Sequence, residues 1–167
     1  MRTQSIWSQK PIVGGRWTVK DVVQGKPLHH PSHPMFVHFP SALFPVALLL
    51  DVISLFDPSV AVTRAAFYNI AAGLVMAGGA ALTGLVDYLP MVGGSRKKKL
   101  GTYHLVAQLV AVSAMGVSLA LRALDFDTDQ TGAPALAAAA IGVGAMVFGN
   151  YFGGVLVYRQ GMRVSTE

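Results

Sequence analysis

Residues 35–56 read MFVHFPSALFPVALLLDVISLF, and this stretch decides the fold class. Crossing about 30 Å of hydrocarbon takes roughly 20 consecutive, mostly apolar residues in a helix. The stretch is long enough, contains Asp51 as its one charged residue, and ends at Asp57, which the following Pro58 pushes out of helical conformation. It therefore predicts a transmembrane helix, which Pro45 should kink.

Three more apolar stretches of sufficient length follow, and the connections between all four are short. The predicted spans are 35–56, 62–88, 102–124 and 134–158. Short connections favour antiparallel neighbours. We therefore predict an all-α, integral membrane four-helix bundle over residues 35–158 with up-down-up-down topology. An N-terminal tail (residues 1–34) and a short C-terminal tail (residues 159–167) flank it.

The composition agrees with a membrane protein and excludes several chemistries. Only 13% of the residues are charged and 53% are hydrophobic, whereas a soluble domain carries roughly 25% charged residues. The chain has no cysteine, which excludes disulfides, thiolate metal sites and cysteine nucleophiles. No serine lies in a Gly-x-Ser-x-Gly context near a histidine. The sequence thus favours a protein that is not an enzyme.

The charges predict the orientation of the bundle. Five Lys or Arg residues in the first 28 residues, the run Arg96–Lys99 and the tail residues Arg159 and Arg163 all fall on one side of a four-span bundle. By the positive-inside rule this side, with both termini, is cytoplasmic. The net charge of +5 then reflects topology, and no nucleic-acid partner is expected. The first 28 residues contain no apolar core, so we expect no cleavable signal peptide and a first span that serves as its own insertion signal.

Four of the five histidines lie at the start of the first span, and the fifth starts the third span. Odd spans begin on the cytoplasmic side, so His33, His38 and His104 should lie at the same depth. Even spans end there, which brings Asp87 and Arg159 to that depth as well. Ionisable groups near the hydrocarbon are costly unless they are paired, ligated or wetted. The topology therefore predicts one polar cluster at the cytoplasmic mouth of the bundle.

This cluster is compatible with three roles. A b-type haem would take His38 and His104 as axial ligands, with Gln108 orienting His104 from one turn along the helix and Arg159 neutralising a propionate. One transition metal ion would instead take ligands from three imidazoles and a carboxylate; the candidates are His33, His38, His104 and Asp87. In a protein without a cofactor, the same side chains would hydrogen-bond to one another or to backbone carbonyls.

The sequence resembles the DUF2231 family of bacterial four-span membrane proteins. The resemblance rests on His33-Pro34-Met35-Phe36-Val37-His38-Phe39-Pro40, Gly84-Leu85-Val86-Asp87-Tyr88-Leu89, His104 and Gly153-Gly154-Val155-Leu156-Val157-Tyr158-Arg159-Gln160-Gly161. It covers about residues 26–164. Family members usually have histidine at the position of Gln160. The family has no established activity, although some relatives look like fusions to Rieske-type iron–sulfur domains.

The resemblance implies a bacterial inner-membrane protein that associates with redox proteins. We therefore expect a small, non-catalytic subunit of a larger redox or energy-converting membrane complex, with or without haem b. The alternatives are a stand-alone b-type cytochrome and a mononuclear metal-binding membrane protein. No inverted repeat is apparent, so a transporter is not favoured.

Small residues repeat every four positions in the last predicted span, at Ala145, Gly149 and Gly153. Such a stripe lets a neighbouring helix approach closely. It predicts tight packing inside the bundle and, as an alternative, a homo-oligomer. In the basic tail, Trp7 and Trp17 are expected to lie at the membrane interface or against a partner.

Overall fold

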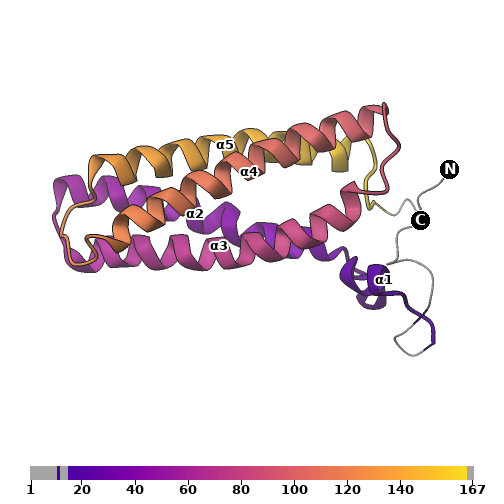
Figure 1. Ribbon diagram of the computed structural model, residues 1–167, viewed down its shortest axis with the longest axis horizontal. Helices are drawn as coiled ribbons and strands as arrows, with labels where there is room; N and C mark the ends of the chain where they lie inside the picture. Colours follow the sequence, from indigo (N-terminus) through magenta and orange to yellow (C-terminus); the bar gives the residue numbers. More distant parts are fainter. Residues whose placement is uncertain (1–10, 12–14, 165–167) are drawn as a thin grey trace.

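The computed structural model describes Pro11 and residues 15–164, and within them the chain is all-α (Figure 1). A short helix α1 (Val19–Val23) and one 3-10 turn η2 (Lys26–Leu28) precede four long helices. These are α2 (Ser32–Phe56), α3 (Val60–Tyr88), α4 (Arg96–Ala123) and α5 (Ala133–Tyr158). Each of the four is long and apolar enough to cross a membrane. The predicted four-helix membrane bundle is therefore confirmed. Trp7, for which the sequence predicted an interfacial or partner-facing position, lies outside the described residues.

The four long helices begin earlier than hydrophobicity alone predicted. The clearest case is α4, which begins at Arg96 although the third span was predicted from residue 102. The Ser95 side chain accepts a hydrogen bond from the Lys98 amide at 3.1 Å and so caps the helix. Residues 96–99, predicted in a loop, therefore form the first turn of α4.

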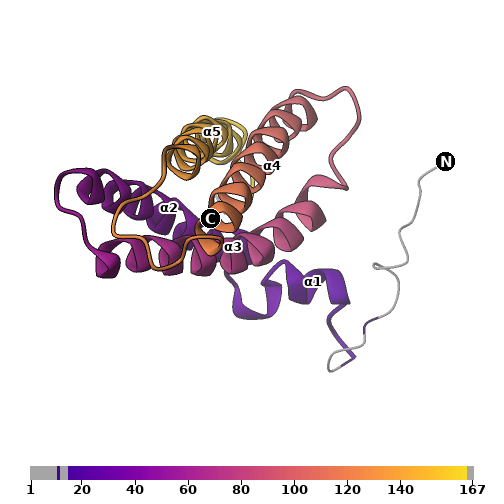
Figure 2. The same ribbon diagram turned by 60° about the vertical axis from the view of Figure 1, so that its left-hand side comes forward.

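The bundle is built from two helical hairpins. Helix α2 packs closely on α3 and α4 packs closely on α5, while the hairpins meet through the less extensive contacts of α2 with α5 and α3 with α4 (Figure 1; Figure 2). Both hairpins run up and then down, so α2 and α4 point in the same direction. The starts of α2 and α4 and the ends of α3 and α5 thus lie together, as the topology predicted. We call this the histidine end, and the opposite one the network end.

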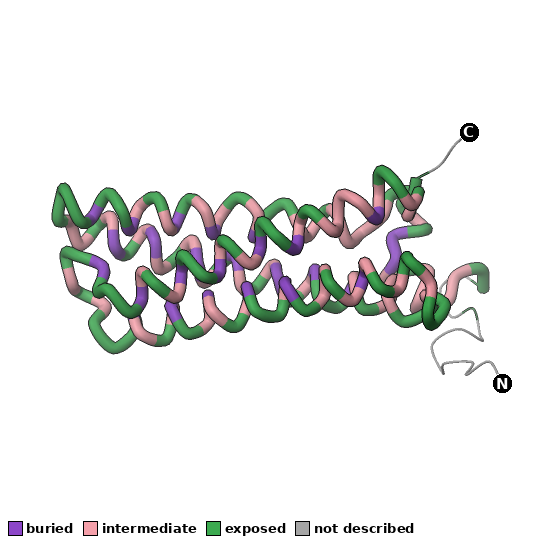
Figure 3. Tube along the Cα trace, turned by 90° about the horizontal axis from the view of Figure 1, so that it is seen from above, coloured by how far each residue is buried: buried purple, intermediate pink, exposed green. Residues whose placement is uncertain are grey.

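The core is narrow and consists mainly of small residues. Phe44, Ile70 and Met115 are its largest fully buried apolar side chains, and buried positions form stripes along the inner faces of the helices (Figure 3). Phe44 packs on Gly73 and Met115 packs on Gly142 so closely that a Cβ at either glycine would lie within 2.8 Å of the ring or the thioether. The outer faces carry exposed apolar side chains such as Leu49, Val75 and Ile141, as a lipid-facing surface requires.

The two hairpins are equivalent halves of the molecule. Buried residues of α2 recur in α4 at a constant separation of 71 residues. The matching pairs are Pro40 and Ala111, Phe44 and Met115, Ala47 and Ser118, and Asp51 and Arg122. Between α3 and α5 the separation is two residues shorter, and the matching buried pairs include Ala66 and Ala135, Ile70 and Ala139, Gly73 and Gly142, and Ala80 and Gly149.

The two halves run in the same direction, and the contacts of α2 with α5 and of α3 with α4 are equally extensive; we infer that a half-turn about the bundle axis relates the halves. The repeat is therefore parallel and not inverted. Equivalent side chains on α2 and α4 consequently lie at the same depth on opposite sides of the axis. This places His33 opposite His104 and Asp51 opposite Arg122.

Candidate functional site: a histidine pair at one end of the bundle

His33 is held against the partner helix of its own hairpin. Its Nδ1 lies 2.9 Å from the Ala80 carbonyl oxygen and 3.3 Å from the Thr83 hydroxyl, both on α3. The ring lies flat enough on α3 that a Cβ at Gly84 would come within 2.8 Å of its Cε1. Glycine at position 84 is thus needed for the histidine to pack in this way.

His104 repeats this arrangement in the second half. Its Nδ1 lies 2.8 Å from the Gly149 carbonyl oxygen on α5, and a Cβ at Gly153 would lie 3.2 Å from its Cε1. A carbonyl oxygen can only accept, so Nδ1 of each ring donates the hydrogen bond. In a neutral imidazole the proton on Nδ1 leaves the lone pair on Nε2. Both rings are therefore set in the tautomer that binds a metal through Nε2.

The two imidazoles meet at the interface between the halves. Their ring centroids are 6.2 Å apart and their planes are inclined by 86°. Both side chains are half-buried. Two histidines that are 71 residues apart in sequence therefore form one site, and the equivalence of the hairpins explains why they reach the same depth.

The other candidates from the sequence are placed differently. His38 is exposed on α2, and Arg159 is exposed at the C-terminal cap of α5. Asp87 belongs to the histidine end, where its side chain is 8% exposed, forms an ion pair with Arg163 and accepts a hydrogen bond from Gln24 Nε2 at 3.0 Å. The carboxylate thus fastens the segments before and after the bundle to α3.

Gln108 was expected to orient His104 from one turn away. In the structure its Nε2 donates to the Asn150 side-chain oxygen at 2.8 Å, and Asn150 in turn donates to the Ser41 hydroxyl at 3.1 Å. This chain of polar contacts links α4, α5 and α2 just inside the histidine pair. The carbonyl of Gly149, a residue that the sequence pattern marked only as part of a small-residue stripe, orients His104 instead.

Within the described residues, no group of three or more histidine, aspartate or glutamate side chains is close enough to share a metal ion. The four-ligand set of His33, His38, His104 and Asp87 is therefore not assembled in this structure. What the fold does assemble is a two-imidazole site.

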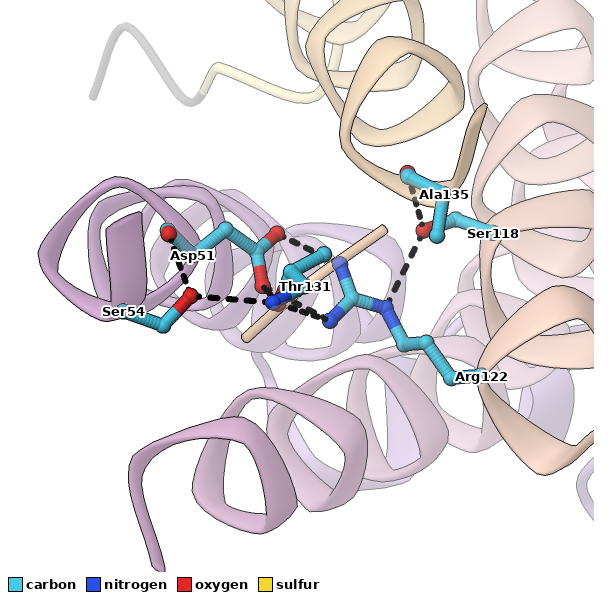
Figure 4. A network of polar contacts seen from close by, with 6 residues as sticks. All are labelled: Asp51, Ser54, Ser118, Arg122, Thr131 and Ala135. Atoms are coloured by element: carbon cyan, nitrogen blue, oxygen red, sulfur yellow. Dashed lines mark hydrogen bonds and ion pairs between the residues drawn. The ribbon is translucent and has the colours of Figure 1, made fainter. Parts of the chain in front are cut away.

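A second buried polar cluster lies at the network end, and the sequence did not reveal it as a pair (Figure 4). Arg122 on α4 binds Asp51 on α2 through both amino groups, at 2.7 Å and 2.5 Å. The side chains are only 7% and 0% exposed. In the sequence, Asp51 lies near the end of the first predicted span and Arg122 near the end of the third. The signal that joins them is the 71-residue repeat, which was recognised only in the structure.

Hydroxyl groups complete this cluster. Thr131 donates to Asp51 at 2.9 Å and Arg122 Nε donates to Ser118 at 3.2 Å. Ser118 donates to the Ala135 carbonyl at 2.7 Å, while Ser54 accepts from the Thr131 amide at 3.1 Å. Among the described residues, no buried side-chain nitrogen or oxygen lacks a partner. The cluster is thus closed, with its hydrogen-bonding groups engaged inside the protein, and it favours a structural role.

The fold and the paired imidazoles define a four-span, all-α membrane protein made of two equivalent hairpins. The profile of one family, described as "Predicted membrane protein (DUF2231)", matches residues 29–166. The chain belongs to this family, which confirms the resemblance. No curated protein and no solved structure matches the chain.

Proposed function

We propose that this protein is a small electron-transfer subunit of a redox or energy-converting membrane complex, and that it binds one b-type haem through His33 and His104. The observation that supports this most is the matched setting of the two rings. Each Nδ1 donates to a backbone carbonyl of its own hairpin, which leaves the lone pair of each neutral ring on Nε2, and the two rings are neighbours, with centroids 6.2 Å apart.

The two imidazoles are close enough that both would hold one haem. Their ring centroids are 6.2 Å apart. His33 from one half and His104 from the other would be the residues that hold the haem.

The set of available ligands favours haem over a mononuclear protein-ligated metal. A structural zinc site needs four protein ligands and a catalytic one needs three. The described residues provide two imidazoles here, since His38 is exposed and Asp87 is engaged by Arg163 and Gln24. A haem iron needs no more than two, because its macrocycle supplies the other four nitrogens.

The protein's own contribution is to orient and tune the ligands. The carbonyls of Ala80 and Gly149 fix each ring and, as hydrogen-bond acceptors, increase the basicity of the opposite nitrogen. Haem, when bound, supplies reversible one-electron transfer. As part of this proposal, the histidine end faces the cytoplasm and the membrane is the bacterial inner membrane; the basic first turn of α4 supports this orientation by the positive-inside rule.

The test is an absorption spectrum of detergent-purified protein, oxidised and then reduced with dithionite. We expect a Soret band and sharpened α and β bands on reduction. His33→Ala and His104→Ala should each abolish these bands. His38→Ala is the matched control, because it removes the same side chain from an exposed position five residues along α2, and its spectrum should be unchanged.

Two results would contradict the haem site. One is a flat visible spectrum from protein purified with its partners from haem-sufficient cells. The other is a spectrum that His38→Ala removes and His33→Ala leaves intact. Bound iron, copper or zinc without a Soret band would point to the mononuclear alternative.

Association with a complex is tested separately by purification in digitonin. Co-migration with larger redox subunits is expected, and a solitary bundle would contradict the association.

A further inference from the structure

A cleft at the histidine end gathers basic and aromatic side chains outside the bundle. It has a volume of about 350 Å³ and lies between the segment that contains α1 and η2 and the segment after α5. Its walls are formed by Trp17, Gln24, Gly25, Lys26, His29, His30, Pro31 and Arg163. The cleft borders the start of α2 at Ser32, so it lies where the chain enters the membrane.

The wall that carries most of these groups is a tightly wound turn. Gly25 adopts a φ of +77°, and its carbonyl accepts hydrogen bonds from the Leu28 and His30 amides at 3.0 and 3.3 Å. A Cβ at position 25 would lie 2.0 Å from the His30 carbonyl oxygen, so only glycine fits. His29 is left-handed, with a φ of +52°, a conformation that costs free energy in residues other than glycine. The turn thereby presents Lys26, His29 and His30 to one space.

Two cationic side chains, Lys26 and Arg163, line the cleft, and among the described residues that line it there is no carboxylate. Each cation also forms an ion pair with an acid that is not among these lining residues, Lys26 with Asp21 and Arg163 with Asp87. The hydrogen bond from Lys26 holds the pKa of Asp21 well below its usual range, so this acid stays ionised. A guanidinium has five N–H donors and an ammonium has three, more than these single carboxylate oxygens accept.

We propose that this cleft is a phosphate-binding site in which Lys26, Arg163 and His30 bind a phosphate group. A phosphate offers several strong acceptor oxygens, and charge-assisted hydrogen bonds to Arg and Lys are the usual way to bind it. Because the cleft lies at the membrane boundary, the phosphate can belong to an anionic phospholipid of the inner leaflet. A soluble phosphate compound has the same chemistry. This site is independent of the histidine pair and of the proposed haem.

The test uses the fluorescence of Trp17, which lies in the cleft wall with the Arg16 guanidinium 5.0 Å from its ring centre. The chain has two tryptophans, so Trp7→Phe leaves Trp17 as the only one. The full-length Trp7→Phe protein in dodecylmaltoside micelles is titrated with phosphatidic acid, with phosphatidylcholine and with inorganic phosphate. A saturable change with phosphatidic acid alone identifies a lipid site, and one with inorganic phosphate as well identifies a general phosphate site. Both support the proposal.

Variants decide whether the cleft itself binds. Lys26→Gln combined with Arg163→Gln should weaken binding about tenfold or more. Arg159→Gln is the matched control, because it removes one exposed cation at the same end but outside the cleft, and it should change the affinity less than about twofold. Asp87→Asn should tighten binding, because it frees Arg163 from its competing carboxylate.

No saturable change with either phosphate probe would overturn the proposal. So would equal losses from the cleft variants and from Arg159→Gln, since that result would indicate unspecific attraction to a basic surface. Asp87→Asn also tests whether the double variant loses binding only because the C-terminal segment detaches from α3. Asp87→Asn breaks the same ion pair, so in that case it will lose binding as well. That outcome also counts against the site.

Discussion

The two ends of the bundle differ in how side chains at equivalent positions of the two hairpins interact. At the network end, Asp51 and Arg122 face each other across the axis as opposite charges and bind directly. At the histidine end, His33 and His104 are chemically identical and each hydrogen-bonds within its own half. A direct ion pair fastens the halves together. Two like rings cannot form such an ion pair and lie edge to face instead.

This difference follows from what each pair gains by contact. A buried arginine and aspartate lose a large hydration energy, so they remain charged only with complete partners, and hydroxyl groups supply them (Figure 4). The two imidazoles are like groups and form no such ion pair. One end therefore holds the halves together by an ion pair, while the other keeps two oriented imidazoles in place.

The largest expected effect comes from breaking the pair at the network end. Arg122→Ala leaves Asp51 buried without its partner and should cost about 3–5 kcal/mol of unfolding free energy. Thermal unfolding in detergent measures this. Arg64→Ala is the control, because Arg64 pairs with Asp127 at the same end but both are exposed, and its cost should stay within about 1 kcal/mol. Equal losses would show that burial does not distinguish the two pairs.

A smaller effect is expected where His33 packs on α3. Gly84→Ala places a Cβ within 2.8 Å of the imidazole and should destabilise the bundle by about 1–3 kcal/mol through overpacking. It should also displace His33 and so lower haem occupancy. Gly78→Ala on the same helix meets nothing within 4 Å and should be neutral or slightly stabilising. Unchanged stability and unchanged spectrum in Gly84→Ala would contradict the close packing.

The hydrogen bonds that connect Gln108, Asn150 and Ser41 should contribute less to stability than the packing of His33 on α3. Gln108→Leu removes its hydrogen bond to Asn150, and interhelical hydrogen bonds in membranes average about 0.6 kcal/mol. We expect a loss of that order and a Soret band that is unshifted, because Gln108 bonds to Asn150 and not to His104. A shifted band would restore the orienting role first expected for Gln108.

The smallest effect concerns α1, outside the membrane. Asp21 accepts from Lys26 and from the Thr18 amide and hydroxyl, and these bonds depress its pKa. Since the folded pKa is lower than the unfolded value of about 3.9, the stabilisation is full above that value and is lost as the pH falls through the folded pKa. The protection factors of the α1 amides, taken relative to the intrinsic exchange rate at each pH, should therefore fall on acidification below about pH 4. In Asp21→Asn these protection factors should be low at every pH, and an unchanged fall on acidification in this variant would exclude Asp21 as the cause.

Much of the fold could be predicted because the physical rule is local. Four runs of apolar residues each exceed the hydrocarbon thickness, and short connections leave few topologies. The first and last residues of the helices were less predictable, since hydrophobicity marks where the membrane begins and not where a helix begins. At α4 the Ser95 cap decides the first residue.

Only part of the site could be predicted. The alternation of helix direction assigned His33, His104 and Asp87 to one end, and the structure has them there. It could not distinguish His33 from His38, since which face of α2 turns inward depends on packing against α3. His38 was favoured as a haem ligand, yet it is exposed, while His33 contacts Ala80 and Gly84.

The sequence by itself determined that this chain crosses a membrane four times, which end carries the histidines and which family it belongs to. These follow from composition along the chain and from the energy of burying apolar residues in lipid. Only the tertiary structure decided that the two hairpins are equivalent halves, that His33 pairs with His104, and that Asp51 pairs with Arg122. The reason is that small residues set how closely each helix approaches its neighbour, and that approach determines which side chains meet across the axis.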